Sequence, residues 1–179
     1  MRKSISVLVT AAALALPAVP AWAQQSQISR ETLTIDRECA SLQKAAYATP
    51  PVRLVQDNGT WRVASSADVT AAQQSKRSVA LANAWKQADR YAIVTIDSFD
   101  ASGAQTAVQL CYRVQTDGTG TLARAREAND VGMVDGATAQ EAYYGLDGAM
   151  IYQNKLFDPK DPLLFKTVES LPFYDVLPK

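Results

Sequence analysis

The chain has 179 residues, with 18 Lys and Arg against 18 Asp and Glu and no histidine. Hydrophobic residues make up 47% and charged residues 20%, which excludes a disordered tail, a collagen-like repeat and a strongly basic nucleic-acid binder. Without histidine there is no Ser-His-Asp triad, no Cys-His pair and no His-ligated metal. Two cysteines are too few for a four-ligand zinc site, and we expect no cofactor.

Residues 1–23 have the pattern of an export signal. Arg2 and Lys3 form a short positive segment, an apolar run follows over residues 5–15, and Ala21 and Ala23 are small residues where a signal peptidase reads. The apolar run is too short to span a membrane as a helix, which disfavours the alternative of a membrane anchor. We therefore expect cleavage after Ala23, one globular domain over residues 24–179, and no stable membrane insertion afterwards. The alanine-rich leader is typical of bacteria and indicates the periplasm or secretion.

The first helix is predicted from Ser29 or Thr34 to about Tyr47, after a loose polar segment over residues 24–29. Four residues at helical spacing form its core stripe: Ile35, Cys39, Leu42 and Ala46. The two prolines at 50 and 51 end the helix.

A β-hairpin is predicted over residues 52–64, with Asn58 and Gly59 as its two-residue loop, because both residue types tolerate a positive φ. Counting outward from the loop gives three facing pairs: Asp57 with Thr60, Gln56 with Trp61, and Leu54 with Val63. The predicted buried face carries Val52, Leu54, Trp61 and Val63.

A long second helix is expected next. Ser65 and Asp68 form a capping box, and the residues up to about Asp89 are rich in Ala, Gln, Lys and Arg.

Strands over 90–98, 105–115 and 121–128, with turns at 100–103 and 117–120, predict an antiparallel meander. The first of these strands is apolar on both faces and is therefore expected to be central. Its predicted faces are Tyr91, Ile93 and Thr95 on one side and Ala92, Val94 and Ile96 on the other. In the third strand we expect Arg124 and Arg126 on one side and Ala123 and Ala125 on the other.

Short elements are expected at the end of the chain. A capping box from Thr138 to Glu141 predicts a helix through Tyr144, residues 150–152 form its end or a short strand, and a helix opened by Pro162 covers 163–171. Residues 171–179 form an extended tail. The predicted fold class is α+β, with an antiparallel sheet of four or five strands (the hairpin plus the three-stranded meander) packed with two longer helices and short late helices.

Cys39 and Cys111 are expected to form a structural disulfide, because they are an even pair in an exported chain and too far apart for a C-x-x-C redox motif. Cys111 shares its predicted strand face with Gln109 and Arg113 rather than with the apolar residues around it. If the first helix covered the apolar face, the two cysteines would be out of reach. A bulge near Leu110, a first helix on the Cys111 face, or two free thiols would each resolve the conflict. We favour the second, with the second helix covering the other face.

Candidate binding residues are few. Arg124 and Arg126 alternate on one strand and Arg113 extends them across the sheet, which indicates either an anion-binding patch or a solvated sheet face. Tyr143 and Tyr144 are candidates for the wall of a ligand cavity, or for aromatic core.

Paired carboxylates are the histidine-free route to hydrolysis. The candidate pairs are Asp97 with Asp100 and Glu141 with Asp147, although turn formation also explains loop acids. No metal-ligand set is recognised.

The expected function is a non-catalytic periplasmic binding or interaction module, whose partner is another envelope protein or a small ligand. The alternative is a carboxylate-based hydrolase acting on an envelope polymer. A near-neutral net charge gives no reason to expect nucleic acid as a partner.

Overall fold

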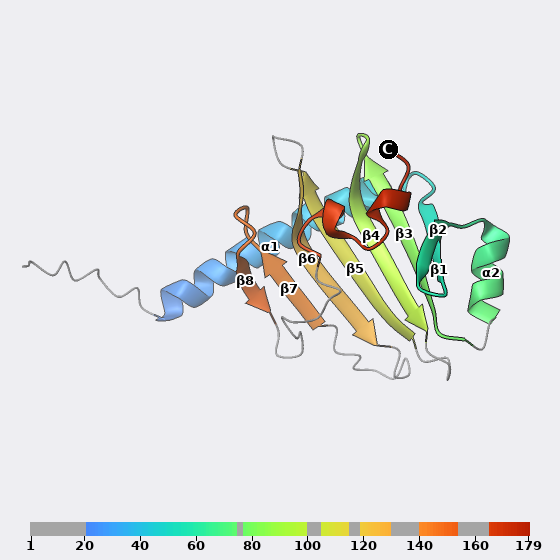
Figure 1. Cartoon of the computed structure of the whole chain (residues 1–179). Coiled ribbons are helices and arrows are strands. Elements are labelled where there is room, and N and C mark those ends of the chain that lie inside the picture. Colours follow the sequence, from blue (N-terminus) through green and yellow to red (C-terminus); the bar gives the residue numbers. More distant parts are fainter. Residues whose placement is uncertain (1–20, 75–76, 100–104, 115–118, 130–139, 154–164) are drawn as a thin grey trace, which may run out of the picture.

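The computed structural model describes residues 21–74, 77–99, 105–114, 119–129, 140–153 and 165–179 (Figure 1). The predicted export signal up to residue 20, the turn at 100–103, most of the turn at 117–120 and the helix-opening Pro162 lie outside these residues.

The architecture is α+β, as predicted, but the antiparallel sheet has eight strands rather than four or five. The elements in chain order are α1 (Ala21–Ala46), β1 (Val52–Asp57), β2 (Thr60–Val63), α2 (Ser66–Gln74), β3 (Val79–Gln87), β4 (Arg90–Phe99), β5 (Gln105–Val114), β6 (Gly120–Asn129), β7 (Gln140–Tyr144), β8 (Met150–Gln153) and two short 3-10 turns, η1 (Val168–Ser170) and η2 (Tyr174–Val176). The strand order across the sheet is β2-β1-β3-β4-β5-β6-β7-β8, which leaves β2 and β8 at the two edges and β4 in the middle, where it was expected.

The hairpin of β1 and β2 is confirmed with its register. Asn58 has φ 50° and Gly59 has φ 81°, as a tight turn of this kind requires. The predicted pairs all form: Asp57 with Thr60, Gln56 with Trp61, and Leu54 with Val63. Of the predicted buried face, Leu54 is fully buried and Val63 is half exposed, because β2 is an edge strand.

The long second helix is wrong. Its capping box is correct, since Ser65 and Asp68 exchange hydrogen bonds between side chain and backbone amide at 2.8 and 3.2 Å, but α2 ends at Gln74 and β3 begins at Val79. A second tight turn, at Ala88 and Asp89 with φ 47° and 66°, joins β3 to β4. Cross-strand pairing with β1 and β4 overrides the helix propensity of the alanine-rich segment.

The late helices are also wrong. Residues 140–144 form strand β7, which pairs with β6, and residues 150–153 form β8, the short strand that was one of the two expectations. Within the described part of 163–171, only the single 3-10 turn η1 is helical. Sheet pairing again outweighs a local capping signal, because it satisfies the backbone of β7 on both sides.

Helix α1 covers one face of the sheet, which we call the α1 face. It begins at Ala21, earlier than expected, so the segment 24–29 is helical rather than loose. Its predicted stripe packs onto residues of β4, β5, β6 and β7, and the buried set is Ile35, Cys39, Ala46, Ile93, Cys111, Ala123 and Tyr143. The first turns of α1 extend past the edge strand β8 (Figure 1).

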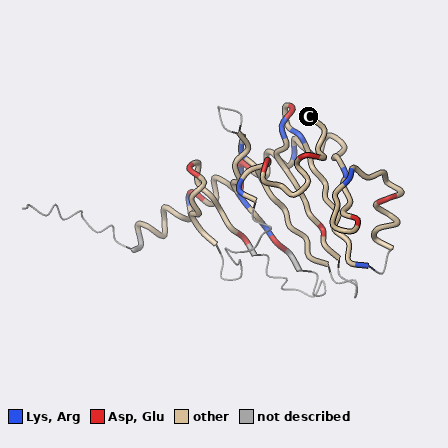
Figure 2. The backbone as a smooth tube through the Cα atoms, viewed as in Figure 1, with Lys and Arg blue, Asp and Glu red and all other residues tan. Residues whose placement is uncertain are grey.

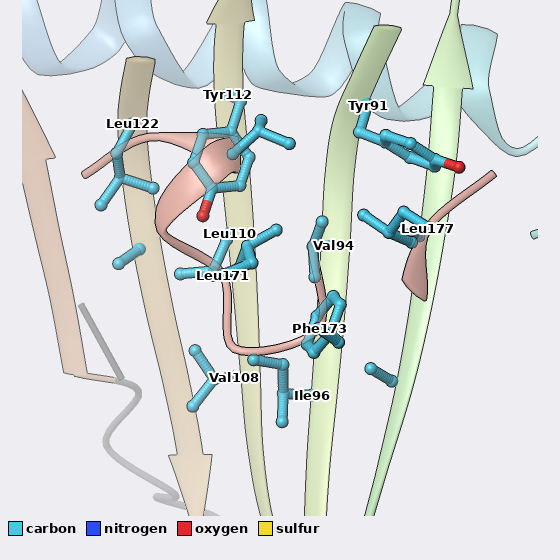
Figure 3. Close-up of a cluster of buried hydrophobic side chains, with 14 of the residues drawn as sticks. Tyr91, Val94, Ile96, Val108, Leu110, Tyr112, Leu122, Leu171, Phe173 and Leu177 are labelled. Atoms are coloured by element: carbon cyan, nitrogen blue, oxygen red, sulfur yellow. The ribbon is translucent and has the colours of Figure 1, made fainter. Parts of the chain in front are cut away.

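The opposite face, which we call the C-terminal face, is covered by residues 165–179 and not by α2. Figure 3 shows Leu171, Phe173 and Leu177 lying over the strand residues Val94 and Leu110. Three hydrogen bonds attach the segment: Tyr91 Oη to Pro178 O at 2.8 Å, Tyr112 Oη to Phe165 O at 3.2 Å, and Leu122 N to Lys166 O at 2.8 Å. The tail predicted to be extended is therefore a fixed cover with its own 3-10 turn, η2.

Two β-bulges change the predicted faces of single residues. Trp85 faces Ile93 while Lys86 faces Tyr91, so Ala92 is the extra residue and Tyr91 joins the C-terminal face instead of the Ile93 face. A bulge between Cys111 and Tyr112 likewise makes Ala123 the extra residue of β6. Ala123 packs on the α1 face, on the same side as Arg124 rather than opposite it.

The disulfide between Cys39 and Cys111 is confirmed, with a Cα–Cα distance of 5.9 Å. It forms because α1 covers the face that carries Cys111, which is the arrangement favoured above. Both residues are fully buried, so the bridge lies inside the layer between α1 and the sheet.

Candidate functional site

A row of ion pairs joins α1 to the sheet. Arg113 donates to Glu38 at 2.7 and 3.0 Å, and Arg124 donates to Asp36 at 2.8 Å. Arg126 pairs with Glu141 of the neighbouring strand at 3.2 Å. Helix α1 therefore covers the part of this sheet face that carries Arg113 and Arg124, whereas Arg126 stays half exposed. Each of the three guanidinium groups has a carboxylate partner.

Tyr143 lies between two of these carboxylates. Its hydroxyl is 3.1 Å from an oxygen of Asp36 and 3.1 Å from an oxygen of Glu141, so its single proton serves one of them at a time. Burial raises the pKa of Tyr143, and the negative charges of Glu141 and Asp36 raise it further. The phenol consequently stays protonated and acts as a hydrogen-bond donor that positions α1, not as a base.

A groove of about 640 Å³ lies between α1 and the turn that joins β7 to β8, and we call it the hairpin groove. Its apolar lining residues are Ile35, Leu146 and Ile151. Tyr144 also borders the groove, although its side chain packs on the C-terminal face. Its remaining lining residues are Arg30, Glu31, Thr34, Glu38, Arg113, Gly145, Asp147 and Ala149. The volume is in the range of sites for small ligands, and an apolar floor with a charged rim suits an amphipathic ligand.

Four of the five charged lining residues already have partners. Glu31 accepts from Gln27 at 2.9 Å, Glu38 pairs with Arg113, and Asp147 accepts from the amide of Ala149 at 2.9 Å. Among the described residues, no hydrogen-bond or ion-pair partner is recorded for the guanidinium of Arg30, which is exposed at the rim. The lining as a whole carries a net charge of −1, because the carboxylates of Glu31 and Asp147 are bonded only to neutral donors.

The predicted candidate residues are divided between the groove and the ion-pair row. Arg113 and Tyr144 line the groove, whereas Arg124, Arg126 and Tyr143 belong to the row and do not line it. Tyr143 and Tyr144 face opposite sides of the sheet, as adjacent strand residues do.

Sequence reasoning missed Arg30, Leu146 and Ile151 as lining residues. The available signal was Leu146, a large apolar residue within a Gly-Leu-Asp-Gly turn, where polar residues are usual.

The predicted carboxylate pairs gain no catalytic geometry. Glu141 is held by Arg126 and Tyr143, and Asp147 is used by its own turn. Burial raises the pKa of Asp97, while a hydrogen bond from Gln105 at 3.0 Å opposes the rise. Its predicted partner Asp100 lies outside the described residues. In the part of the chain that the structure describes, no group of three or more Cys, Asp or Glu side chains could hold a metal ion.

A second hollow, of about 330 Å³, lies between the β3–β4 turn and the C-terminal segment. Lys86 lies over the ring of Tyr91, and Lys179 lies over the ring of Tyr174, at 5.0 and 5.9 Å from the ring centres. Both lysines therefore make cation–π contacts with aromatic rings that line the hollow. Elsewhere, basic and acidic positions are interspersed along the described chain (Figure 2).

Comparisons with family models, with curated proteins and with solved structures find no match for this chain. Within the described ranges, no helix is both long and apolar enough to cross a membrane.

Proposed function

We propose that this protein is an exported, non-catalytic binding module that holds an amphipathic ligand in the hairpin groove. The observation that carries the proposal is the groove itself, where the exposed Leu146 and the partly exposed Ile151 present apolar surface beside the guanidinium of Arg30. The polar residues of the ion-pair row are committed to one another, so they serve to fix α1 as one wall of the groove.

Export to the periplasm is supported by the disulfide, because disulfides persist in oxidising compartments and are rare in the cytosol. Residues 1–23 supply the sequence pattern for it. N-terminal sequencing of exported material should begin at Gln24. Protein that is retained in the membrane and still begins at Met1 would overturn the prediction of export.

The binding proposal is tested with the fluorescent probe 1-anilinonaphthalene-8-sulfonate, which has an apolar body and one negative charge. Leu146 is 69% exposed and lines the groove, so Leu146→Ser should leave the fold intact and weaken probe binding about fivefold, since about 1 kcal/mol of apolar contact is lost. Val63, 50% exposed at the opposite edge of the sheet, gives the matched control Val63→Ser, which should bind like the parent.

Thermal unfolding of both variants must match that of the parent protein, so that a difference in fluorescence reports the groove. Equal probe binding by the parent and by Leu146→Ser would overturn the proposal. The carboxylate-hydrolase alternative stays a prediction, and hydrolysis of an envelope polymer that is lost in Asp97→Asn would favour it instead.

A further inference from the structure

We infer that Asn58 is a site of spontaneous covalent modification, at which the asparagine is converted to aspartate and isoaspartate. The inference goes beyond the proposed function, since Asn58 lies in the turn between β1 and β2, at the opposite edge of the sheet from the hairpin groove. Three features carry it: the glycine that follows the asparagine, the exposure of the turn, and the hydrogen bonding around the two residues.

The reaction is an attack of the backbone on the side-chain amide. The backbone nitrogen of Gly59 bonds to Cγ of Asn58 and loses its proton, while the bond from Cγ to the side-chain nitrogen breaks, so that ammonia leaves and a cyclic succinimide remains. Water then opens the ring. Addition of water at Cγ gives aspartate, whereas addition at the main-chain carbonyl carbon gives isoaspartate, in which the chain runs through Cβ and Cγ. The net change is one water consumed and one ammonia released.

The turn leaves the attacking nitrogen open to approach. Glycine hinders the attack least of all residues, because it has no Cβ. Asn58 and Gly59 are both exposed, and a Cβ placed on Gly59 would meet no heavy atom within 4 Å apart from its chain neighbours. To bring Cγ onto the nitrogen, Asn58 must rotate about its Cα–C bond. Only the edge strand β2, which is four residues long, has to shift with that rotation.

Hydrogen bonding does not hold the two reacting groups. Strand pairing stops at Asp57 and Thr60, and within the described residues no hydrogen bond is recorded for the side chain of Asn58 or the backbone amide of Gly59. Asn83 is the contrast. Its half-buried carboxamide donates to Thr95 Oγ1 at 3.3 Å, and the backbone that follows it lies between β1 and β4. The structure therefore exposes one asparagine to this reaction and protects the other.

The two products differ in their effect on the hairpin. Aspartate tolerates the positive φ of 50° at this position, so it adds a negative charge and keeps the turn. Isoaspartate lengthens the main chain by one carbon atom, which a two-residue loop cannot absorb without losing the register of β1 with β2. Trp61 of β2 packs on Phe173, with ring centres 4.8 Å apart. Isoaspartate should therefore loosen β2 and, through Trp61, the segment that covers the C-terminal face.

The test is incubation of the purified, folded protein at mildly alkaline pH, followed by digestion and mass spectrometry of the peptides that contain Asn58 and Asn83. Conversion raises the mass of a peptide by about 1 Da, and we expect Asn58 to convert at least about tenfold faster than Asn83. The control variant is Asn58→Gly, which keeps the turn because glycine adopts a positive φ, and whose peptide should keep its mass. Conversion of Asn58 no faster than that of Asn83 would overturn the inference.

The structural consequence is tested by hydrogen exchange on the isoaspartate form, separated from the incubated protein by chromatography. Exchange should be faster than in the parent protein over residues 60–63 and 173–177, and unchanged in β8 at the other edge of the sheet. The matched control is Asn58→Asp, which adds the charge without lengthening the chain and should exchange like the parent protein. An isoaspartate form that exchanges like Asn58→Asp would overturn the predicted loosening of β2 and of the segment packed against it.

Discussion

Loss of the Cys39–Cys111 disulfide should destabilise the protein by about 4 kcal/mol. The bridge closes a loop with a sequence separation of 72, and in the chain-entropy model a loop of that size raises the free energy of the unfolded state by about this amount. Both cysteines are fully buried, so reduced thiols would still fill the same space. The comparison of oxidised with reduced wild-type protein therefore isolates the cross-link from the loss of packing.

The assay is urea unfolding followed by tryptophan fluorescence, with and without reductant. At a typical slope of about 2 kcal/mol per molar urea, the midpoint should fall by about 2 M. The double variant Cys39→Ala/Cys111→Ala is the control, because its midpoint should not respond to reductant. A difference below about 1 kcal/mol between oxidised and reduced protein would refute the reasoning that loop closure is the main contribution of the bridge.

Three further predictions concern the C-terminal cover, a partly buried acid and a strained turn. Phe173→Ala should lower the free energy of unfolding by about 3–5 kcal/mol, measured by urea unfolding, because Phe173 is fully buried against the sheet. Asp97→Asn should be more stable than the parent protein at pH 7. Burial raises the pKa of Asp97 in the folded protein above the unfolded value of about 3.9, so the carboxyl group destabilises the fold as pH rises through the folded pKa. The stability gain of the variant should therefore disappear below about pH 3, where the acid is protonated in both states. A difference in the free energy of unfolding between variant and parent that does not change with pH would contradict this. Ala88→Asn should raise the melting temperature, with a gain of about 0.5–1 kcal/mol, since Ala88 has φ 47° and Asn tolerates that conformation; an unchanged or lower value would contradict it.

The two tight turns explain why one hairpin was predictable and the other was not. The residue types of Asn58 and Gly59 indicate a positive φ, so the sequence predicted both the turn and the register of β1 with β2. Ala88 and Asp89 adopt nearly the same backbone conformation without that signal, and the alanine-rich segment before them favoured a helix. The second turn is determined by pairing between β3 and β4, which no local pattern reports.

The candidate site was predictable only in part, for a related reason. Arg113 was identified as a strand residue beside Cys111, and the correct placement of α1 followed from the disulfide. The groove, however, depends on the contact between α1 and the β7–β8 turn, and residues 140–144 were expected to be helical. A local capping pattern cannot indicate that Gln140–Tyr144 finds partners on two neighbouring strands.

The order of the strands has a consequence for how the protein folds. From β4 to β8 each strand pairs with the strand that precedes it in the chain, so this part of the sheet can grow by short-range closures, which are fast. The two covers differ: α1 must find Cys111, and Pro178 must find Tyr91 across a separation of 87 residues. A sheet that forms first would expose apolar residues on both faces until the covers dock, and this is the stage at which the chain is most prone to aggregate. Oxidation of the two thiols at that stage would make the docking of α1 effectively irreversible, leaving only the C-terminal cover free to open and close.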